Sequence, residues 1–285
     1  TLSSSNYTLT GATSAITVSQ APLGVVLAAT YSGTTTVTPT SFTLTGLVNS
    51  ETVTSLSSAV LSSANVSGNG SNYVVSITKG AGTATLSNYS ITAAYNATTG
   101  ITTTNTATLN TKAITIAASN QSTTYGTALA LGSSSYSLTS GSLGTGDAIT
   151  GVTLTQGGNT TVPATQSAAT YSGGTNGILV SAATGTGGFN TTNYSITYAS
   201  GTLTVAALPV TITGAAVYSG STSFNTATSG SSLSVTNAVN GDTVTVSGTG
   251  TLSSASAGSR SLNSLSGLTL SSSNYTLTGA TSAIT

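Results

Sequence analysis

The sequence predicts an all-β fold made of tandem β-sandwich modules. Three observations predict it: a composition rich in Thr, Val, Ile and Tyr, an alternation of apolar and polar residues, and an internal repeat. Only three of the 285 residues are Lys or Arg and three are Asp or Glu, so 2% are charged where soluble domains have about 25%. The net charge is zero and the mean hydropathy is +0.27, whereas disordered chains combine low hydrophobicity with high net charge. We therefore expect a folded chain of residues that favour strands.

The alternation has a period of two residues, as expected for strands with one buried face. It is clearest where apolar residues alternate with Ser or Thr, at 194–198, 203–205 and 244–246. Clusters of Gly, Ser and Asn interrupt these runs about every 8–12 residues, which is typical of a sandwich or barrel. No amphipathic helix of convincing length is present.

An identical repeat is the strongest feature of the sequence. Residues 269–285 repeat residues 1–17 letter for letter, as TLSSSNYTLTGATSAIT. We therefore expect the chain to be one period of a tandem array in a much longer protein, with 1–17 the closing strand of a preceding module.

A weaker repeat divides the period into three modules, predicted at 18–111, 112–206 and 207–285. Each begins with an alternating run, at Ile16-Thr17-Val18, Ile114-Thr115-Ile116 and Val210-Thr211-Ile212. Each continues with a tyrosine–glycine turn, at Tyr31-Ser32-Gly33, Tyr125-Gly126 and Tyr218-Ser219-Gly220. Each carries one acid, Glu51, Asp147 or Asp242, and an Asn-Tyr pair, at Asn88, Asn193 or Asn274.

The absence of His and Cys removes most site chemistry. No Ser-His-Asp triad, Cys-His pair or zinc site of the usual ligands can form. Three cations cannot neutralise a nucleic-acid backbone, zero net charge argues against an anionic membrane surface, and the longest apolar run is too short to span a bilayer. We predict no catalytic, cofactor-binding or metal-binding residues, no cofactor, no nucleic-acid partner and no membrane insertion.

The three acids admit several interpretations. We expect each to bond backbone amides at a turn. A calcium ligand, or an acid that assists a Lys–Asn isopeptide bond, remains the alternative. We expect the tyrosine of each Asn-Tyr pair to pack in the core or at a corner with its hydroxyl bonded to the backbone, with a sugar-stacking platform as the alternative.

The junction at 206–209 is short. It consists of Ala206-Ala207-Leu208-Pro209, with strand patterns on both sides and no flexible linker. Because Pro209 fixes φ and Leu208 is placed to become buried, we expect neighbouring modules to be stiffly coupled.

The ordered motifs carry a family resemblance. Those of the middle module are Lys112-Ala-Ile-Thr-Ile, Thr124-Tyr-Gly, Gly146-Asp147, Asn193-Tyr-Ser-Ile-Thr and Gly201-Thr-Leu-Thr-Val. With them, 112–206 resembles an MBG-type repeat, and 18–111 and 207–285 resemble YDG-type repeats, of giant filamentous-haemagglutinin-like bacterial surface adhesins. Tyr-Ser-Gly stands where Tyr-Asp-Gly is expected, at Ser32 and Ser219, which weakens any transfer of metal binding. The resemblance implies a stalk or adhesive fibre and supplies no ligand.

We therefore expect tandem immunoglobulin-like β-sandwich modules end to end, with β-grasp-like modules as the alternative fold. The expected function is a non-enzymatic structural repeat of a long adhesin or surface filament, outside the cell, on a bacterial surface or in a secreted filament. Its expected partners are neighbouring repeats of the same polypeptide or identical copies in a filament. The alternatives are an adhesive module that binds a host or matrix glycan or protein, and a filament subunit that assembles by strand donation.

Overall fold

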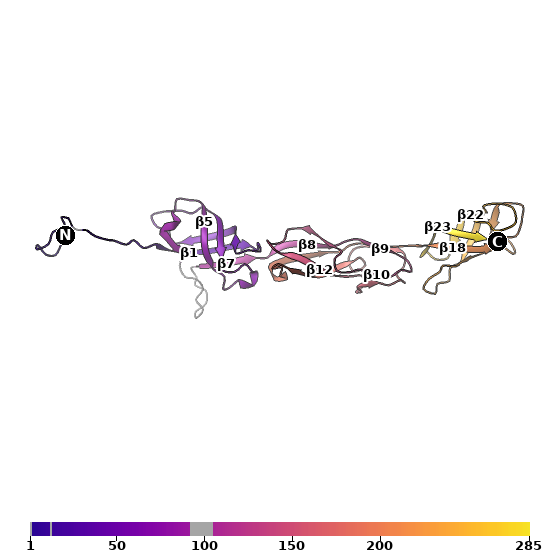
Figure 1. Ribbon diagram of the computed structural model, residues 1–285, viewed down its shortest axis with the longest axis horizontal. Coiled ribbons are helices and arrows are strands. Elements are labelled where there is room, and N and C mark those ends of the chain that lie inside the picture. Colours follow the sequence, from indigo (N-terminus) through magenta and orange to yellow (C-terminus); the bar gives the residue numbers. More distant parts are fainter. Residues whose placement is uncertain (1, 12, 92–104) are drawn as a thin grey trace. The chain divides into compact units, whose positions relative to one another are not determined.

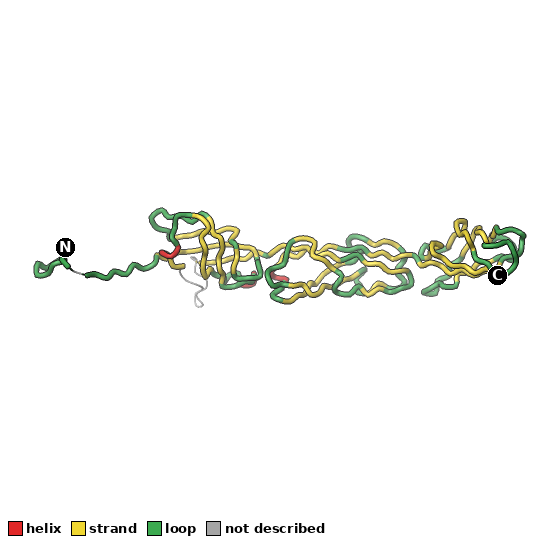
Figure 2. Tube along the Cα trace, turned by 45° about the horizontal axis from the view of Figure 1, so that its top comes forward, coloured by secondary structure: helices red, strands yellow, loops and turns green. Residues whose placement is uncertain are grey.

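The regular structure is almost entirely β. The computed structural model describes residues 2–11, 13–91 and 105–285, and within these ranges the helices are three single-turn 3₁₀ segments (Figure 2). The all-β prediction is confirmed. A β-grasp module needs a helix packed across its sheet, and the described ranges contain no α-helix, so the fold does not support that alternative. No helix in these ranges is long and apolar enough to cross a membrane.

The chain forms two compact units. Unit 1 comprises residues 1–112 together with two short segments, 143–148 and 187–195. Unit 2 comprises residues 113–142, 149–186 and 196–285. The predicted division at 111 and 206 stays a prediction, and residues 92–104 of the first predicted module, where the motif that begins at Asn88 ends, lie outside the described residues.

Two sheets form the body of unit 1 (Figure 1). The strands are β1 (Ala21–Thr30), β2 (Thr36–Val37), β3 (Pro39–Thr45), β4 (Ser55–Leu61), β5 (Val74–Ala81), β6 (Tyr89–Ile91) and β7 (Asn105–Asn110). The 3₁₀ turns are η1 (Val66–Gly68), η2 (Leu86–Asn88) and η3 (Thr191–Asn193). In one sheet β1 lies between β3 and the parallel strands β6 and β7, and in the other β4 lies between β2 and β5.

The core of unit 1 lies between these sheets. Alternate residues of β1, Leu23, Val25, Leu27 and Ala29, are buried there with residues of β4, β5 and β7. The alternation that the sequence shows is therefore the inside–outside pattern of the strand.

Unit 2 contains the remaining strands in several small sheets, except that three of these strands begin in unit 1, at Lys112, Ala148 and Tyr194. The first of these strands are β8 (Lys112–Ala118), β9 (Gln121–Thr124), β10 (Leu129–Ala130), β11 (Tyr136–Ser140), β12 (Ala148–Thr155), β13 (Thr161–Val162), β14 (Ala169–Tyr171), β15 (Leu179–Thr186), β16 (Tyr194–Ala199) and β17 (Leu203–Ala206). The others are β18 (Leu208–Ala215), β19 (Ser223–Asn225), β20 (Ser232–Val235), β21 (Val246–Leu252), β22 (Leu262–Leu270) and β23 (Tyr275–Ile284). In each predicted module the last strand pairs in parallel with an early strand, as β7 with β1, β17 with β9 and β23 with β18.

The structure corrects the register of the first module. The sequence predicts that Ile16-Thr17-Val18 begins this module as an alternating strand, but residues 13–20 form no strand, and Ile16 and Val18 are 84% and 89% exposed. The first strand is β1, where Leu23 and Val25 face the core. A run of polar residues and a proline separate the two stretches, so alternation alone selected the wrong one.

The junction between β17 and β18 is as short as predicted. Only Ala207 separates the two strands. The N–H of Leu208 donates to the carbonyl of Asn274 at 2.9 Å, which fixes the start of β18. The Leu208 side chain, which is placed to become buried, is half-buried, and Pro209 is exposed.

Candidate functional site

One acid and two tyrosines form a cluster in unit 1, which we call the Asp147 cluster. Oδ2 of Asp147 accepts hydrogen bonds from the hydroxyl of Tyr31, at 2.8 Å, and from the hydroxyl of Tyr194. The two rings meet edge to face, with centroids 5.3 Å apart and an interplanar angle of 76°. Both tyrosines are at most 5% exposed and Asp147 is half-buried. A single carboxylate oxygen therefore joins side chains that lie 116 and 47 residues from it in the sequence.

A tight turn positions the acid of this cluster. The N–H of Asp147 donates to the carbonyl of Gly144 at 3.0 Å, and Gly146 has a φ of +87°, which favours glycine. The N–H of Gly144 donates to the hydroxyl of Tyr194 at 2.8 Å. The hydroxyl of Tyr194 thus accepts from the turn and donates to the acid at the end of the same turn.

Unit 2 contains a second cluster of the same design, the Asp242 cluster. The hydroxyls of Tyr125 and Tyr275 donate to Oδ2 of Asp242 at 2.7 and 2.9 Å, and their rings meet edge to face at 5.5 Å and 72°. The N–H of Val239 donates to the hydroxyl of Tyr275 at 2.9 Å, and the N–H of Asp242 closes the turn onto the carbonyl of Val239 at 3.0 Å. Tyr125 and Asp242 are 117 residues apart, nearly the separation of the pair in unit 1.

The third acid forms half of such a cluster, which we call the Glu51 pair. The hydroxyl of Tyr89 donates to Oε2 of Glu51 and accepts from the N–H of Val48 at 3.0 Å. The N–H of Glu51 closes the turn onto the carbonyl of Val48 at 2.9 Å. Among the described residues, no second tyrosine bonds Glu51.

An asparagine beside each cluster bonds a backbone amide. Oδ1 of Asn193, which is fully buried, accepts from the N–H of Val66 at 2.9 Å, and its amide nitrogen donates to Asn65 at 2.9 Å. In unit 2, Oδ1 of Asn274 accepts from the N–H of Ala168 at 2.8 Å. The Asn-Tyr pair thus makes two separate anchoring contacts.

The glycine of the tyrosine–glycine turn allows a close approach in both complete clusters. A Cβ on Gly33 would lie 2.5 Å from the backbone of Thr145, and a Cβ on Gly126 would lie 2.6 Å from the side chain of Val239. Both glycines also have positive φ, of +86° and +87°. A larger residue in place of Gly33 or Gly126 would displace the turn that carries the acid, which we call the acid turn.

The environment of the tyrosines shifts their ionisation. Burial, and then the hydrogen bond to Asp147, raises the pKa of Tyr31 to about 12. The same causes raise the pKa of Tyr194 further. Burial raises the pKa of Tyr275, and the hydrogen bond to Glu51 raises that of Tyr89. Each shift has the same meaning: the protonated phenol, which donates to the carboxylate, is the stable form.

The structure changes the roles predicted for these residues. The tyrosines of the Asn-Tyr pairs are buried with their hydroxyls bonded to backbone N–H groups, so that prediction is confirmed. The acids were expected to bond backbone amides, and instead they accept from tyrosine hydroxyls while the hydroxyls bond the amides. The sequence analysis missed the pairing of Tyr31 and Tyr125 with these acids, although a tyrosine–glycine turn and an acid occur together in every predicted module.

The alternative roles of the acids find little support in the geometry. Within the described ranges, no group of three or more His, Cys, Asp or Glu side chains gathers in a way that could hold a metal ion. The amino group of Lys79 donates to the carbonyl of Gly82 at 2.9 Å, and that of Lys112 to the carbonyl of Leu143 at 3.2 Å. The clusters are therefore suited to holding segments of the chain together.

The chain is an all-β protein whose recurrent site is a structural contact of one acid and two tyrosines. Residues 202–283 match the YDG domain family, in agreement with the predicted YDG-type module at 207–285. The matched stretch contains Asp242 and Tyr275, and Tyr125 of the same cluster lies outside it. No curated protein and no solved structure matches the chain.

Proposed function

We propose that the chain is a structural repeat, a stalk or extender, of a long extracellular bacterial adhesin or surface filament. In this proposal the middle segment, 112–206, is an MBG-type module between two YDG-type modules. The observation that carries the proposal is the recurrence of one contact, tyrosine to acid, at sequence separations of 116 and 117 residues. Because each separation exceeds the length of one predicted module, each contact ties a turn in one module to a turn in the next.

The strand pairing within the modules supports the same function. In the first and the last predicted module the first and last strands run in parallel, so the chain enters such a module near one pole and leaves near the other. Strands advance about 3.3 Å per residue, and a module of this size is about 35 Å long. Copies joined in this way add length with each repeat.

The chemistry of the clusters supports a mechanical role without catalysis. Each complete cluster uses its carboxylate to accept two phenol hydrogen bonds, and general acid–base catalysis at a glycosidic bond requires two carboxylates about 5–10 Å apart. Each described cluster contains a single carboxylate. Neighbouring repeats are then the principal partners, and binding of a host or matrix glycan or protein remains the alternative.

Small-angle X-ray scattering of the full chain tests the proposal. A compact protein of 285 residues has a radius of gyration of about 19 Å. Three modules of about 35 Å in line correspond to a radius of gyration of about 30 Å. A value near 30 Å supports an extender, and a value near 19 Å, or a broad distribution that includes folded-back shapes, contradicts it.

A further inference from the structure

Among the described residues, no acid lies beside the third tyrosine–glycine turn. Tyr218 matches Tyr31 and Tyr125 in sequence, but it is 71% exposed where they are 3% and 4% exposed. A Cβ on Gly220 would meet only the hydroxyl of Tyr218 itself, at 4.0 Å, whereas Gly33 and Gly126 are closely covered by an acid turn. The described part of unit 2 therefore presents half of a cluster, a turn tyrosine without its acid.

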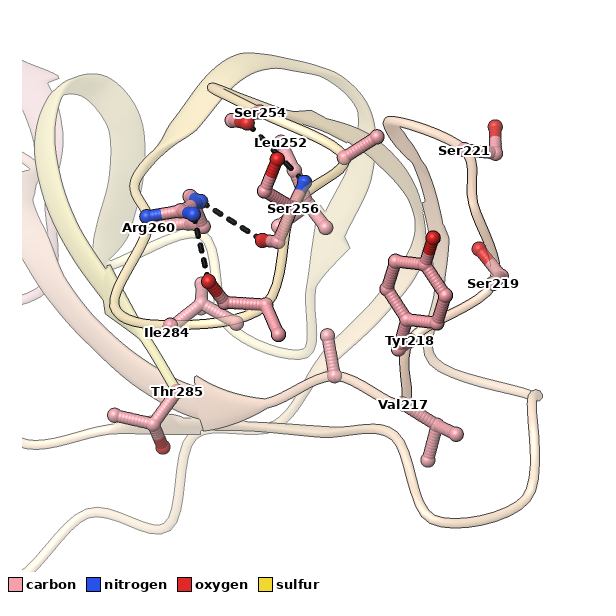
Figure 3. A pocket seen from close by; sticks show the side chains of 14 residues that line it. Val217, Tyr218, Ser219, Ser221, Leu252, Ser254, Ser256, Arg260, Ile284 and Thr285 are labelled. Carbon is pink, nitrogen blue, oxygen red and sulfur yellow. Dashed lines mark hydrogen bonds between the residues drawn. The ribbon is translucent and has the colours of Figure 1, made fainter.

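A pocket of about 220 Å³ lies beside this tyrosine (Figure 3). Val217 and Tyr218 form one side, and Leu252, Ser256 and the end of β23 lie across from them. Val217 is 56% exposed, so the pocket has an uncovered apolar rim. The one charged side chain among the lining residues is Arg260, whose guanidinium is held by the backbone carbonyls of Ser256, Ala257 and Ser259.

The far wall of the pocket contains a loop that resembles one in unit 1, where an asparagine side chain bonds the loop. The sequence Leu-Ser-Ser-Ala occurs at 61–64 and again at 252–255, where each copy leaves a strand that ends at its leucine; a further copy, at 56–59, lies within β4. The loops have the same local bond, from the N–H of Asn65 to Ser63 and from the N–H of Ser256 to Ser254, each at 3.2 Å. In unit 1 the next residue, Val66, donates its N–H to Asn193. The equivalent residue of the pocket is Ala257, and no acceptor for its N–H is found in the described ranges.

The complementary half of the cluster is present in unit 1. Glu51 and Tyr89 form an acid turn that is bonded by one tyrosine where the complete clusters have two. Asn88, which precedes Tyr89, is exposed, whereas the equivalent Asn193 is fully buried. The charge of Glu51 is also opposite to that of Arg260.

We propose that the pocket beside Tyr218 is the docking site for the Glu51 turn of a second copy of this sequence. Tyr218 of one copy donates to Glu51 of the other, which already bonds its own Tyr89, and the result is a third complete cluster. Asn88 of the second copy accepts from the N–H of Ala257, as Asn193 accepts from Val66. The proposal deepens the proposed function, on which it rests, by naming the partner of each repeat.

The strand pairing supports the same partner. In unit 1 the pairing of β1 with β7 continues to the N–H of Tyr31, which donates to the carbonyl of Asn110 at 2.9 Å. In unit 2 the backbone bonds between β18 and the chain at the end of β23 stop earlier. The last of them runs from the N–H of Ala216 to the carbonyl of Thr285, at 3.0 Å. The pairing would have to extend by two residues beyond Thr285 for the N–H of Tyr218 to make the bond that Tyr31 makes in unit 1. Where the repeated sequence occurs at 1–17, those residues are Val18 and Ser19, and Val18 is 89% exposed.

The test uses a polypeptide in which a second copy of residues 18–285 directly follows Thr285, with Tyr218→Phe in the second copy only. Tyr218 then reports on the first copy alone, and hydroxyl-radical footprinting with mass spectrometry measures its exposure. We expect it to react at the rate of Tyr31 and Tyr125 in this polypeptide, and at the rate of Tyr7 in the single chain. An equal, fast rate in both proteins overturns the proposal.

Matched variants separate docking from a general loss of structure. Glu51→Ala in the second copy is expected to restore fast modification of Tyr218, whereas Glu51→Ala in the first copy leaves it protected. Both variants break the same bond to Tyr89, so an equal effect of the two overturns the proposal. Scattering of the single chain does not depend on Tyr218. An extended single chain together with an unprotected Tyr218 in the first copy of the two-copy polypeptide therefore refutes the docking and leaves the extender function intact.

Discussion

Removing one hydroxyl from the Asp147 cluster tests whether its carboxylate holds unit 1 together. Tyr194→Phe preserves the ring, its edge-to-face contact with Tyr31 and its stacking on Phe189 at 5.1 Å. The variant loses a hydrogen bond to a charged acceptor, which contributes about 1.5–3 kcal/mol, and leaves the buried N–H of Gly144 without its partner, which costs about 1–3 kcal/mol. Because Asp147 is half-buried and water can replace part of the loss, we expect about 2–3 kcal/mol in total.

Tyr198→Phe is the matched control for this variant. The hydroxyl of Tyr198 also accepts from a backbone N–H, that of Ala183 at 3.0 Å, but it bonds no carboxylate. We expect this variant to cost about 1 kcal/mol. Hydrogen exchange measured by mass spectrometry reports the loss in each segment. It should quicken roughly 30- to 150-fold at 143–148 in Tyr194→Phe, and about fivefold around Ala183 in Tyr198→Phe. Equal effects in the two variants would refute a special role for the acid.

The remaining predictions concern pH. Alkaline spectrophotometric titration should show Tyr31 ionising near pH 12, well above the value near 10 of an unperturbed tyrosine. Because the folded pKa is raised above the unfolded value, the contribution of Tyr31 to stability is full below about pH 10 and is lost as the pH rises towards 12, which urea unfolding at pH 9 and pH 11 measures. Between about pH 5 and 9 the melting temperature should stay constant within a few degrees, because the chain has no His. A larger change would contradict this prediction, because it would require a group that titrates in this range.

The features of the fold that depend on residues close together in the sequence could be predicted. The strand content follows from alternation, and the turns follow from glycine, because residues such as Gly146 adopt a positive φ that other residues avoid. The register of the first module did not follow. Ile16 and Val18 alternate as well as Leu23 and Val25 do, and only the packing of β1 against its neighbours selects the second pair.

The candidate site could be predicted only in part. The burial of Tyr194 and Tyr275 could be expected, because an aromatic ring at a corner packs well and a phenol finds a backbone partner. The partner of Asp147 could not, because Tyr31 is 116 residues away and no local pattern joins the two. The usable signal was the joint recurrence of both residues in each predicted module, which indicates a shared contact without saying whether it lies within a module or reaches the next one.

The clusters also explain how so few charges can matter. A salt bridge would need a cation for each acid and would weaken as salt screens it. Here phenols such as Tyr31 and Tyr125 donate hydrogen bonds to the carboxylates, and no cation is required. The phenol of Tyr31 stays neutral up to high pH, because burial and the hydrogen bond to Asp147 raise its pKa. A contact of this kind is insensitive to moderate changes in salt and pH, which suits the function proposed above. Because it requires only one tyrosine–glycine turn and one acid turn, it can be repeated from module to module while the surface remains Ser, Thr and Gly.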